Sequence, residues 1–334
     1  MRAVAAVAVA LAAAGVVGGP PAVADEGATR VCQFADERFA EISGMTYSLR
    51  HPGVLWVHAD SGGGPYLYAV DGQTCRTIAT VEVTGIEARD LEAIATGRDG
   101  KGRPVLWLAD IGDNLDSWPQ VWLHRIREPR VLVDQAVSAR TYPVSYRDRP
   151  HNAEALMVDP TTGRMWLVTK QLAHGRIYAL PRRMSTSSVN VARPVARVGG
   201  LVTDAAVSPD GSRYVLRDYV DAEVFDGEPP GQSSGLIALP IQPQGEAVTW
   251  TREGDALLVA SERDDRLMRV PAPRAPGAEA VATVPDAGPS PSATATAATP
   301  SAETTIAGLL PWLVGAGVVA LGVLAIAGWR RARA

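Results

Sequence analysis

The sequence lacks the motifs that define several common kinds of metal, nucleotide and catalytic site. Its five histidines are scattered and no His-Glu-x-x-His pair is present, which argues against a zinc site. The run Gly62-Gly63-Gly64 lacks the Gly-Lys-Ser/Thr of a P-loop, so it predicts a flexible turn. There is no Gly-x-Ser-x-Gly elbow for a hydrolase nucleophile. The acidic stretch 110–116 does not have EF-hand spacing and predicts a solvated turn, with a calcium loop as the alternative.

Lysine is scarce, and the overall charge is slightly negative. Lys101 and Lys170 are the only lysines among 32 basic side chains, and the formal net charge is −4. This balance shows no basic excess, so no nucleic-acid partner is predicted. The arginine bias, together with abundant alanine, glycine and proline, is typical of GC-rich, actinobacterial-type genomes.

The N-terminus has the pattern of a secretory signal peptide, predicted over residues 1–24. A positive start precedes an apolar run from Ala3 to Val17, which is too short to span a bilayer comfortably. The small residues Ala22-Val23-Ala24 then form a cleavage site. An uncleaved anchor is the alternative.

The C-terminal region predicts a spacer and a single membrane span. Residues 285–305 are built from Pro, Ala, Ser and Thr and predict a disordered spacer. Residues 306–328 are apolar and long enough to cross about 30 Å of hydrocarbon. The basic tail 329–334 stays in the cytoplasm by the positive-inside rule, and no LPxTG motif suggests sortase attachment. Residues 25–284 are therefore expected to lie outside the cell, anchored in the cell membrane.

The two cysteines, Cys32 and Cys75, both belong to this exported part. Outside the cytoplasm a disulfide can form and persist, and two cysteines allow only one intramolecular pairing. A Cys32–Cys75 disulfide is therefore predicted, with two separate buried thiols as the alternative.

One frame of sequence recurs five times between Glu41 and Val270. An acidic residue precedes or opens a short apolar strand, and a Gly-, Pro- or Asp-rich turn leads to a second strand. First strands are predicted within 41–45, 91–95, 153–157, 203–207 and 245–249. Second strands are predicted at 55–57, 106–108, 165–167, 214–216 and 257–259. Third strands are predicted at 66–70, 176–180 and 266–270.

The repeats predict an all-β fold without long helices. Their spacing of about 42 to 62 residues matches a four-stranded β-propeller blade, whereas a solenoid of hairpins usually has a shorter and more regular period. Five frames predict five blades. Six blades are the alternative, if residues 30–34 and 281–284 form another where the ring closes. The tryptophans on second strands are predicted to pack in the core: Trp56, Trp107 and Trp166.

Acidic residues recur at the start of the frame. In a propeller the first strands line the central channel, so these acids are predicted to form a ring at one mouth: Glu41, Glu92, Glu154, Asp204 and Glu246. Crowded carboxylates repel unless a cation intervenes, and oxygen ligands suit calcium, so the ring is a candidate calcium site. The alternative is structural: each acid accepts backbone N–H groups from a neighbouring blade.

Loop residues that differ between the repeats are better candidates for ligand binding. Most of them follow the second strands, which end at the same face as the acidic ring. Arg89 and Asp90, with His151 and Asn152, come from the loops that enter first strands. The candidate ligand-binding residues are His58, Asp60, Arg89, Asp110, Asp113, Asn114, Lys170, Arg217, Asp218, Glu262 and Arg263.

The recurring frame resembles the phytase-like β-propellers, meaning the bacterial β-propeller phytases and the related "esterase-like activity of phytase" group. Ser208-Pro209-Asp210-Gly211 is also similar to turns of the bacterial WD40-like and TolB-like propellers. The resemblance covers roughly Glu41 to Val270. It implies a propeller fold, calcium ions held by carboxylates on one face, and basic side chains that hold phosphate.

Two functional classes follow from these features. The first, which we favour, is a membrane-anchored surface module that binds an extracellular ligand or protein on a propeller face. The alternative is a divalent-metal-dependent phytase-like (phospho)esterase, in which a carboxylate-held cation polarises the ester. No catalytic nucleophile or acid–base pair is assigned.

Overall fold

The computed structural model describes residues 27–59, 64–173 and 175–273. The predicted signal peptide, spacer, membrane span and tail lie outside these residues, as does Asp60. No helix in the described part is both long and apolar enough to span a membrane. Its elements are β1 (Thr29–Gln33), η1 (Glu37–Glu41), β2 (Ile42–Tyr47), β3 (Val54–Ala59), β4 (Tyr66–Asp71), β5 (Thr77–Thr84), β6 (Leu91–Arg98), β7 (Pro104–Asp110), β8 (Val121–Arg127), β9 (Gln135–Ser138), β10 (Arg140–Tyr146), β11 (Ala153–Val158), β12 (Met165–Thr169), β13 (Gly175–Ala179), β14 (Asn190–Val198), β15 (Asp204–Val207), β16 (Arg213–Arg217), β17 (Asp221–Asp226), β18 (Gln232–Ala238), β19 (Gln244–Trp250), β20 (Ala256–Glu262) and β21 (Asp264–Pro271).

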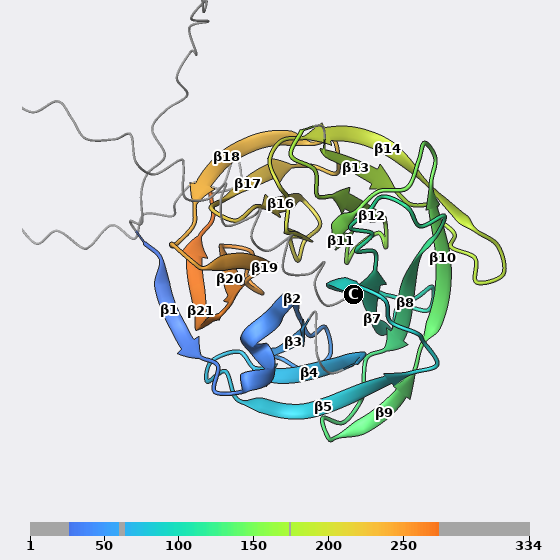
Figure 1. Ribbon diagram of the computed structural model, residues 1–334. Coiled ribbons are helices and arrows are strands. Elements are labelled where there is room, and N and C mark those ends of the chain that lie inside the picture. The colour runs from blue at the N-terminus through green and yellow to red at the C-terminus, as the bar shows by residue number, and fades with distance from the viewer. Residues whose placement is uncertain (1–26, 60–63, 174, 274–334) are drawn as a thin grey trace, which may run out of the picture. The chain divides into compact units, whose positions relative to one another are not determined.

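The strands form antiparallel groups of four, arranged around a ring (Figure 1). The groups are β2-β3-β4-β5, β6-β7-β8-β10, β11-β12-β13-β14, β15-β16-β17-β18 and β19-β20-β21-β1. The first strand of each group lies against the first strand of the next, and β19 lies against β2, which closes the ring. The described chain is therefore all-β and propeller-like, as the repeats predict.

Two parallel pairings join neighbouring groups at the outside of the ring. Strand β9 pairs with β5, and β14 pairs with β10. Figure 1 places β9 beside β5 and β10 along the outer rim next to β14. These pairings cover strand edges that would otherwise carry unpaired backbone groups.

Burial explains which sequence pattern each strand shows. Inner strands such as β3 and β20 are buried on both faces, because neighbouring groups cover them, and they appear in the sequence as continuous apolar runs. The outer strand β5 alternates buried and more exposed residues. The predicted second and third strands are confirmed, and the tryptophans of the second strands are buried: Trp56, Trp107 and Trp166.

The N-terminal strand joins the group that begins at β19, while residues 281–284, the other part of the predicted sixth blade, lie outside the described residues. Strand β1 pairs antiparallel with β21, so the group that starts at β19 draws strands from both ends of the described chain. The predicted disulfide is confirmed: Cys32 in β1 bonds to Cys75, which follows β4, with their Cα atoms 5.7 Å apart. The closing strand is thereby tied covalently to the neighbouring group.

A β-bulge recurs near the start of the inner strands. The pairing register skips one residue in each of β2, β6, β11 and β19, and the skipped residues are Ser43, Glu92, Glu154 and Glu246. A bulge leaves a residue outside the ladder and re-aims its side chain. Glu41 and Asp204 are therefore not equivalent to the three bulged glutamates. Glu41 ends η1 while Ser43 occupies the bulge, and Asp204 pairs directly with Arg217. The acids of the predicted ring do not all occupy equivalent positions.

Candidate functional site

Lys170 lies among carboxylates at the end of the channel. It directly follows β12, and its Nζ is 3.2 Å from Oε2 of Glu154, the bulged residue of β11. The ammonium group also lies over the ring of Tyr219, 5.3 Å from the centroid. We call Asn152, Glu154, Lys170, Tyr219 and Glu246 the mouth cluster.

Electrostatics keep Lys170 charged. Burial alone would lower the pKa of Lys170, but the nearby carboxylates of Glu154, Glu246 and Glu92, together with Tyr219, outweigh burial and raise that pKa well above its usual value. An opposite charge at this distance favours the charged form of both partners. The protein thus supplies a cation of its own to acidic side chains from three of the strand groups.

Glu246 shares its environment with a second carboxyl group. It is 5% exposed, accepts a hydrogen bond from Nε2 of Gln244 at 2.8 Å, and makes a hydrogen bond with Glu262. Burial raises the pKa of Glu246, and Lys170 partly opposes that rise. A hydrogen bond between two carboxyl groups needs a proton on one of them, so this pair is suited to hold one.

Asp204 has the structural role that was the alternative for the acidic ring. Its carboxylate accepts hydrogen bonds from the backbone N–H of Ala205 and, at 2.7 Å, from that of Val248 in the neighbouring group. Burial raises the pKa of Asp204 well above its usual value. This side chain links β15 to β19 and is not open to a ligand.

Arg217, predicted to bind ligand, is fully buried and links the same two groups. Its guanidinium donates to the carbonyls of Ala247 and Ala260, at 2.8 and 3.0 Å, and to Oε1 of Gln242. Ala247 and Ala260 face each other next to the bulge of β19. A Cβ on Gly245 would overlap Nη2 of Arg217, so glycine makes room for the guanidinium.

The loop after β7 is held by two of the predicted ligand-binding acids. Asp110 is fully buried and accepts from the backbone N–H of Asp90 at 2.9 Å. Asp113 accepts from the backbone N–H of Trp118 at 2.6 Å. The Arg89 guanidinium lies between the rings of Trp118 and Trp122, 3.9 and 3.7 Å from their centroids. These contacts hold the loop in its conformation.

The same loop reaches the mouth cluster through Asn114. Its Nδ2 donates to Oδ2 of Asp90 at 2.7 Å, and its Oδ1 accepts from Nδ2 of Asn152 at 3.4 Å. A Cβ on Gly112 would overlap the carboxylates of both Glu92 and Asp90, so the two acids occupy the space that a side chain at this position would fill. Asn114 therefore contacts the mouth cluster through Asn152.

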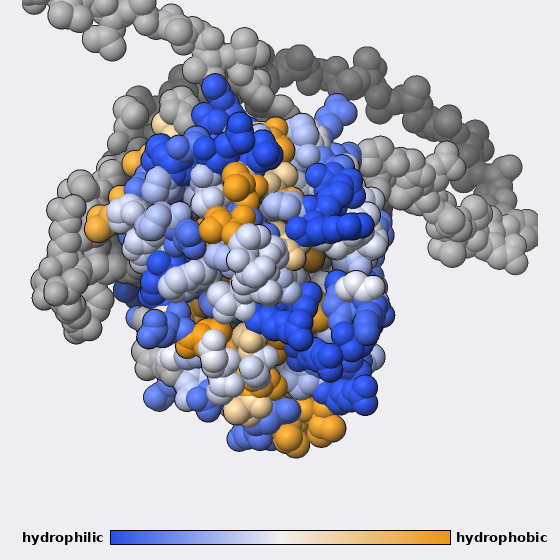
Figure 2. Space-filling model, turned by 90° about the vertical axis from the view of Figure 1, so that its right-hand side faces the viewer, coloured by the Kyte–Doolittle hydropathy of each residue, from blue (hydrophilic) through white to orange (hydrophobic). Residues whose placement is uncertain are grey.

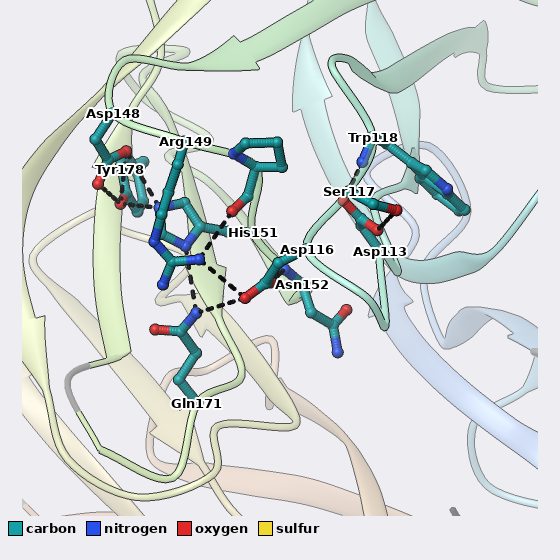
Figure 3. A network of polar contacts seen from close by, with 11 residues as sticks. Asp113, Asp116, Ser117, Trp118, Asp148, Arg149, His151, Asn152, Gln171 and Tyr178 are labelled. Atoms are coloured by element: carbon teal, nitrogen blue, oxygen red, sulfur yellow. Dashed lines mark hydrogen bonds and ion pairs between the residues drawn. The ribbon is translucent and has the colours of Figure 1, made fainter.

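A polar network that sequence reasoning largely missed positions Asn152 (Figure 3). Asp116 accepts from the backbone N–H of Asn152 at 2.6 Å and pairs with Arg149 at 3.0 Å. His151 contacts Asp148 and Tyr178 through Nε2, at 3.1 and 2.6 Å. Burial lowers the pKa of His151, despite the carboxylate of Asp148.

No repeat signal could have revealed this network. Asp116 and Asp148 lie in loops outside the repeated strands, and Tyr178 occupies the same frame position as Tyr68, so none of the three stands out in the repeat. A loop residue's partner across a blade boundary depends on tertiary structure alone.

Asn152 presents an unused acceptor. Its Nδ2 donates to Oε1 of Glu154 at 3.2 Å and to Asn114, which fixes the orientation of the amide. Its Oδ1 is buried and has no hydrogen-bond partner among the described residues. A buried acceptor without a partner costs free energy, so this oxygen is suited to a donor brought by a ligand.

The remaining predicted residues lie elsewhere. His58 is fully buried against Gly44, and burial lowers the pKa of His58 to about 4. Asp218 accepts from the backbone N–H groups of Val220 and Asp221 and forms a turn. Arg263 is exposed and has a positive φ of 57°.

The described residues do not fit a resident metal ion. No group of three or more His, Cys, Asp or Glu side chains there is placed to hold one. Lys170 pairs with Glu154, and Asp204 is used by backbone N–H groups. The predicted calcium site therefore gains no support from side-chain geometry.

No family model matches the chain, and no curated protein matches its sequence. Among solved structures, a gluconolactonase from Xanthomonas campestris is similar over 70% of this chain and 73% of its own, with a TM-score of 0.46 and 16% identity. A chain of a nidogen/laminin complex is similar over 66% of this chain and 72% of its own, with a TM-score of 0.40 and 17% identity. Identities this low carry no information about ligand or reaction.

Proposed function

We propose that the chain is an exported, membrane-anchored propeller of five blades, and that its mouth cluster binds the protonated amine or guanidinium of an extracellular ligand or protein. The described strand groups support the blade number, since each contributes one inner strand to the ring. The sequence patterns at 1–24 and 306–328 support export and anchoring.

The observation that carries the proposal is the buried, unpartnered Oδ1 of Asn152. A hydrogen-bond donor satisfies a carbonyl oxygen of this kind. The adjacent carboxylates of Glu154, Glu246 and Glu92 surround a single lysine, so the local charge favours a donor that is also a cation. A protonated amine or guanidinium meets both requirements.

Binding of cadaverine, a diamine that is protonated at pH 7, tests the proposal. We expect calorimetry on the full chain in detergent to detect binding, and Asn152→Ala to weaken it roughly ten- to hundredfold, since a hydrogen bond to a charged group contributes about 1.5–3 kcal/mol. Gln232→Ala, an exposed change on β18, is the matched control. Equal binding by Asn152→Ala and wild type would overturn the proposal.

A calcium titration of the same preparation separates the proposal from the metal-dependent alternative. We expect neither calcium nor a chelator to change the melting temperature. If calcium raised it while cadaverine did not, and if Glu92→Gln and Glu154→Gln reduced that rise, the hydrolase interpretation would replace the binding module.

Topology is tested by labelling intact cells. In a variant with Cys32 and Cys75 replaced by serine, a cysteine at Ser292 is expected to react with an impermeant thiol reagent. A cysteine inserted after Arg331 is expected to stay unlabelled until the cells are lysed. The reverse pattern would show that the orientation is wrong.

A further inference from the structure

A groove on the outer side of the β6-β7-β8-β10 group is lined by four arginines. It has a volume of about 360 Å³, and its lining includes Arg103, Arg125, Arg127, Arg140, Asp99 and Ser138. We call this groove the arginine groove, after its four arginines. It lies on the outer strands, away from the mouth cluster, and neither the repeat frame nor the proposed function uses it.

The strand register places like charges next to one another. Arg125 of β8 is directly opposite Arg140 of β10. Arg127 lies two residues further along β8, so its side chain points to the same face of the sheet as that of Arg125. Like charges directly opposite each other destabilise a sheet. A negative charge next to these arginines would therefore reduce the repulsion between them.

The described residues do not provide that counter-charge. Asp99 is the only acid in the lining, and Arg103 binds it through Nε at 2.8 Å and Nη2 at 2.6 Å. The hydrogen bond from Arg103 is the main reason that the pKa of Asp99 is strongly lowered. Within the described ranges, Arg125, Arg127 and Arg140 make no ion pair and no side-chain hydrogen bond.

One of these arginines is already positioned by aromatic rings. The guanidinium of Arg125 is 5.3 Å from the ring centroid of Tyr142 and 5.7 Å from that of Trp107. Cation–π contact restrains the side chain while leaving its N–H groups free to donate. The groove therefore contains one guanidinium group restrained by aromatic rings, that of Arg125, and two exposed guanidinium groups, those of Arg127 and Arg140.

The stretch of chain that contains β8 and β10 has an excess of basic residues. Residues 121–200 contain thirteen basic and five acidic side chains, although the whole chain has a net charge of −4. Figure 2 shows the side of the molecule that carries the outer strands β8 and β10, and hydrophilic side chains cover much of it. A concentrated charge of one sign raises the local concentration of oppositely charged ligands.

We propose that the arginine groove binds a phosphate or sulfate group. Guanidinium forks match the oxygens of such tetrahedral anions and donate paired hydrogen bonds to them. A dianion between Arg125 and Arg140 would also neutralise the repulsion between them. The group can come from a free oxyanion or from a lipid headgroup that carries a phosphate monoester.

The test uses the full chain in detergent, with inorganic phosphate or sulfate added and sodium chloride at matched ionic strength as reference. We expect either anion to raise the melting temperature above the chloride reference, and Arg125→Gln and Arg140→Gln to weaken binding at least tenfold. Arg193→Gln, an exposed change on β14 outside the groove, is expected to bind as wild type does.

The melting temperature of Arg140→Gln, compared with and without added anion, separates a binding role of this arginine from a purely structural one. Without added anion and at low salt, Arg140→Gln is expected to melt above wild type, because one of the two opposed charges is gone. With phosphate the order is expected to reverse.

A vesicle arm distinguishes the two sources of the anion. The full chain is reconstituted into phosphatidylcholine vesicles with or without phosphatidic acid. A melting temperature that phosphatidic acid raises in wild type but not in Arg125→Gln indicates a lipid headgroup, whereas a response to the free ions alone indicates a soluble oxyanion. A wild type that responds to neither beyond chloride, or an equal loss of response in Arg193→Gln, would refute the proposal. The cadaverine result at the mouth cluster would be unaffected.

Discussion

Replacing Arg217 with methionine is expected to lower the melting temperature by roughly 8–16 °C. The side chain is fully buried and donates to two main-chain carbonyls and to Gln242. Methionine fills a similar volume but leaves these acceptors unsatisfied, at about 1–3 kcal/mol each, so a total near 4 kcal/mol is expected. In a domain of this size about 1 kcal/mol corresponds to 2–4 °C.

Two further variants keep this prediction testable if the methionine variant does not fold. Gly245→Ala retains the arginine but places a methyl group where Nη2 lies, so it is also expected to destabilise strongly. Exposed Arg193→Gln is the matched control and is expected to melt within about 1 °C of wild type. A methionine variant as stable as wild type would show that Arg217 does not hold the two groups together.

Replacing Lys170 with methionine is expected to cost about 3 kcal/mol at pH 7. Removing one partner of a buried ion pair leaves an uncompensated charge and costs about 3–5 kcal/mol. The lower figure applies because 19% of the Lys170 side chain is exposed and solvent screens part of the interaction. Urea denaturation of wild type and variant measures the difference.

The defect is expected to shrink as the pH falls. Burial already raises the pKa of Glu246, and loss of the lysine charge would raise it further. A carboxyl group whose pKa is higher in the folded state binds more protons when folded, so stability is present below its unfolded pKa of about 4.3 and lost as the pH rises through the folded pKa. The variant should therefore be closest to wild type near pH 4–5.

The chain provides a matched control for this experiment. Lys101 is the only other lysine, and it is exposed. Lys101→Met is expected to leave the free energy of unfolding within about 0.5 kcal/mol of wild type at every pH. A pH-independent loss in Lys170→Met would mean that packing, and not charge, is what the lysine contributes.

The repeat frame predicted the strands because every group buries the same faces in the same way. Turn residues and apolar runs are local signals, so the second and third strands could be located from sequence. The offset at Glu41 shows the limit of this reasoning. An acid two residues before Ser43 looks equivalent to Glu92 in sequence, but the bulge that defines the position is set by pairing with the next strand.

The structure brings Lys170, Glu154 and Glu246 together, whereas main-chain groups bind most of the predicted loop residues. Asp110, Asp113 and Asp218 are satisfied by backbone N–H groups, and Arg217 by carbonyls. A polar residue in a loop is compatible with both binding and shaping that loop. Only the position of its partners, which is set by tertiary structure, distinguishes the two.

The pairing of β1 with β21 has a consequence for the order of biosynthesis. Gln33 and its partner Asp265 are separated by 232 residues along the chain. At ribosomal speeds of about 5–20 residues per second, the first strand is made roughly ten seconds or more before the last strand exists. During that interval β1 is an unpaired edge, and the final group cannot be completed until nearly all of the described chain has been synthesised. Nascent chains that end before residue 264 are thus expected to remain open rings, recognisable to proteases and chaperones by their unmatched strands.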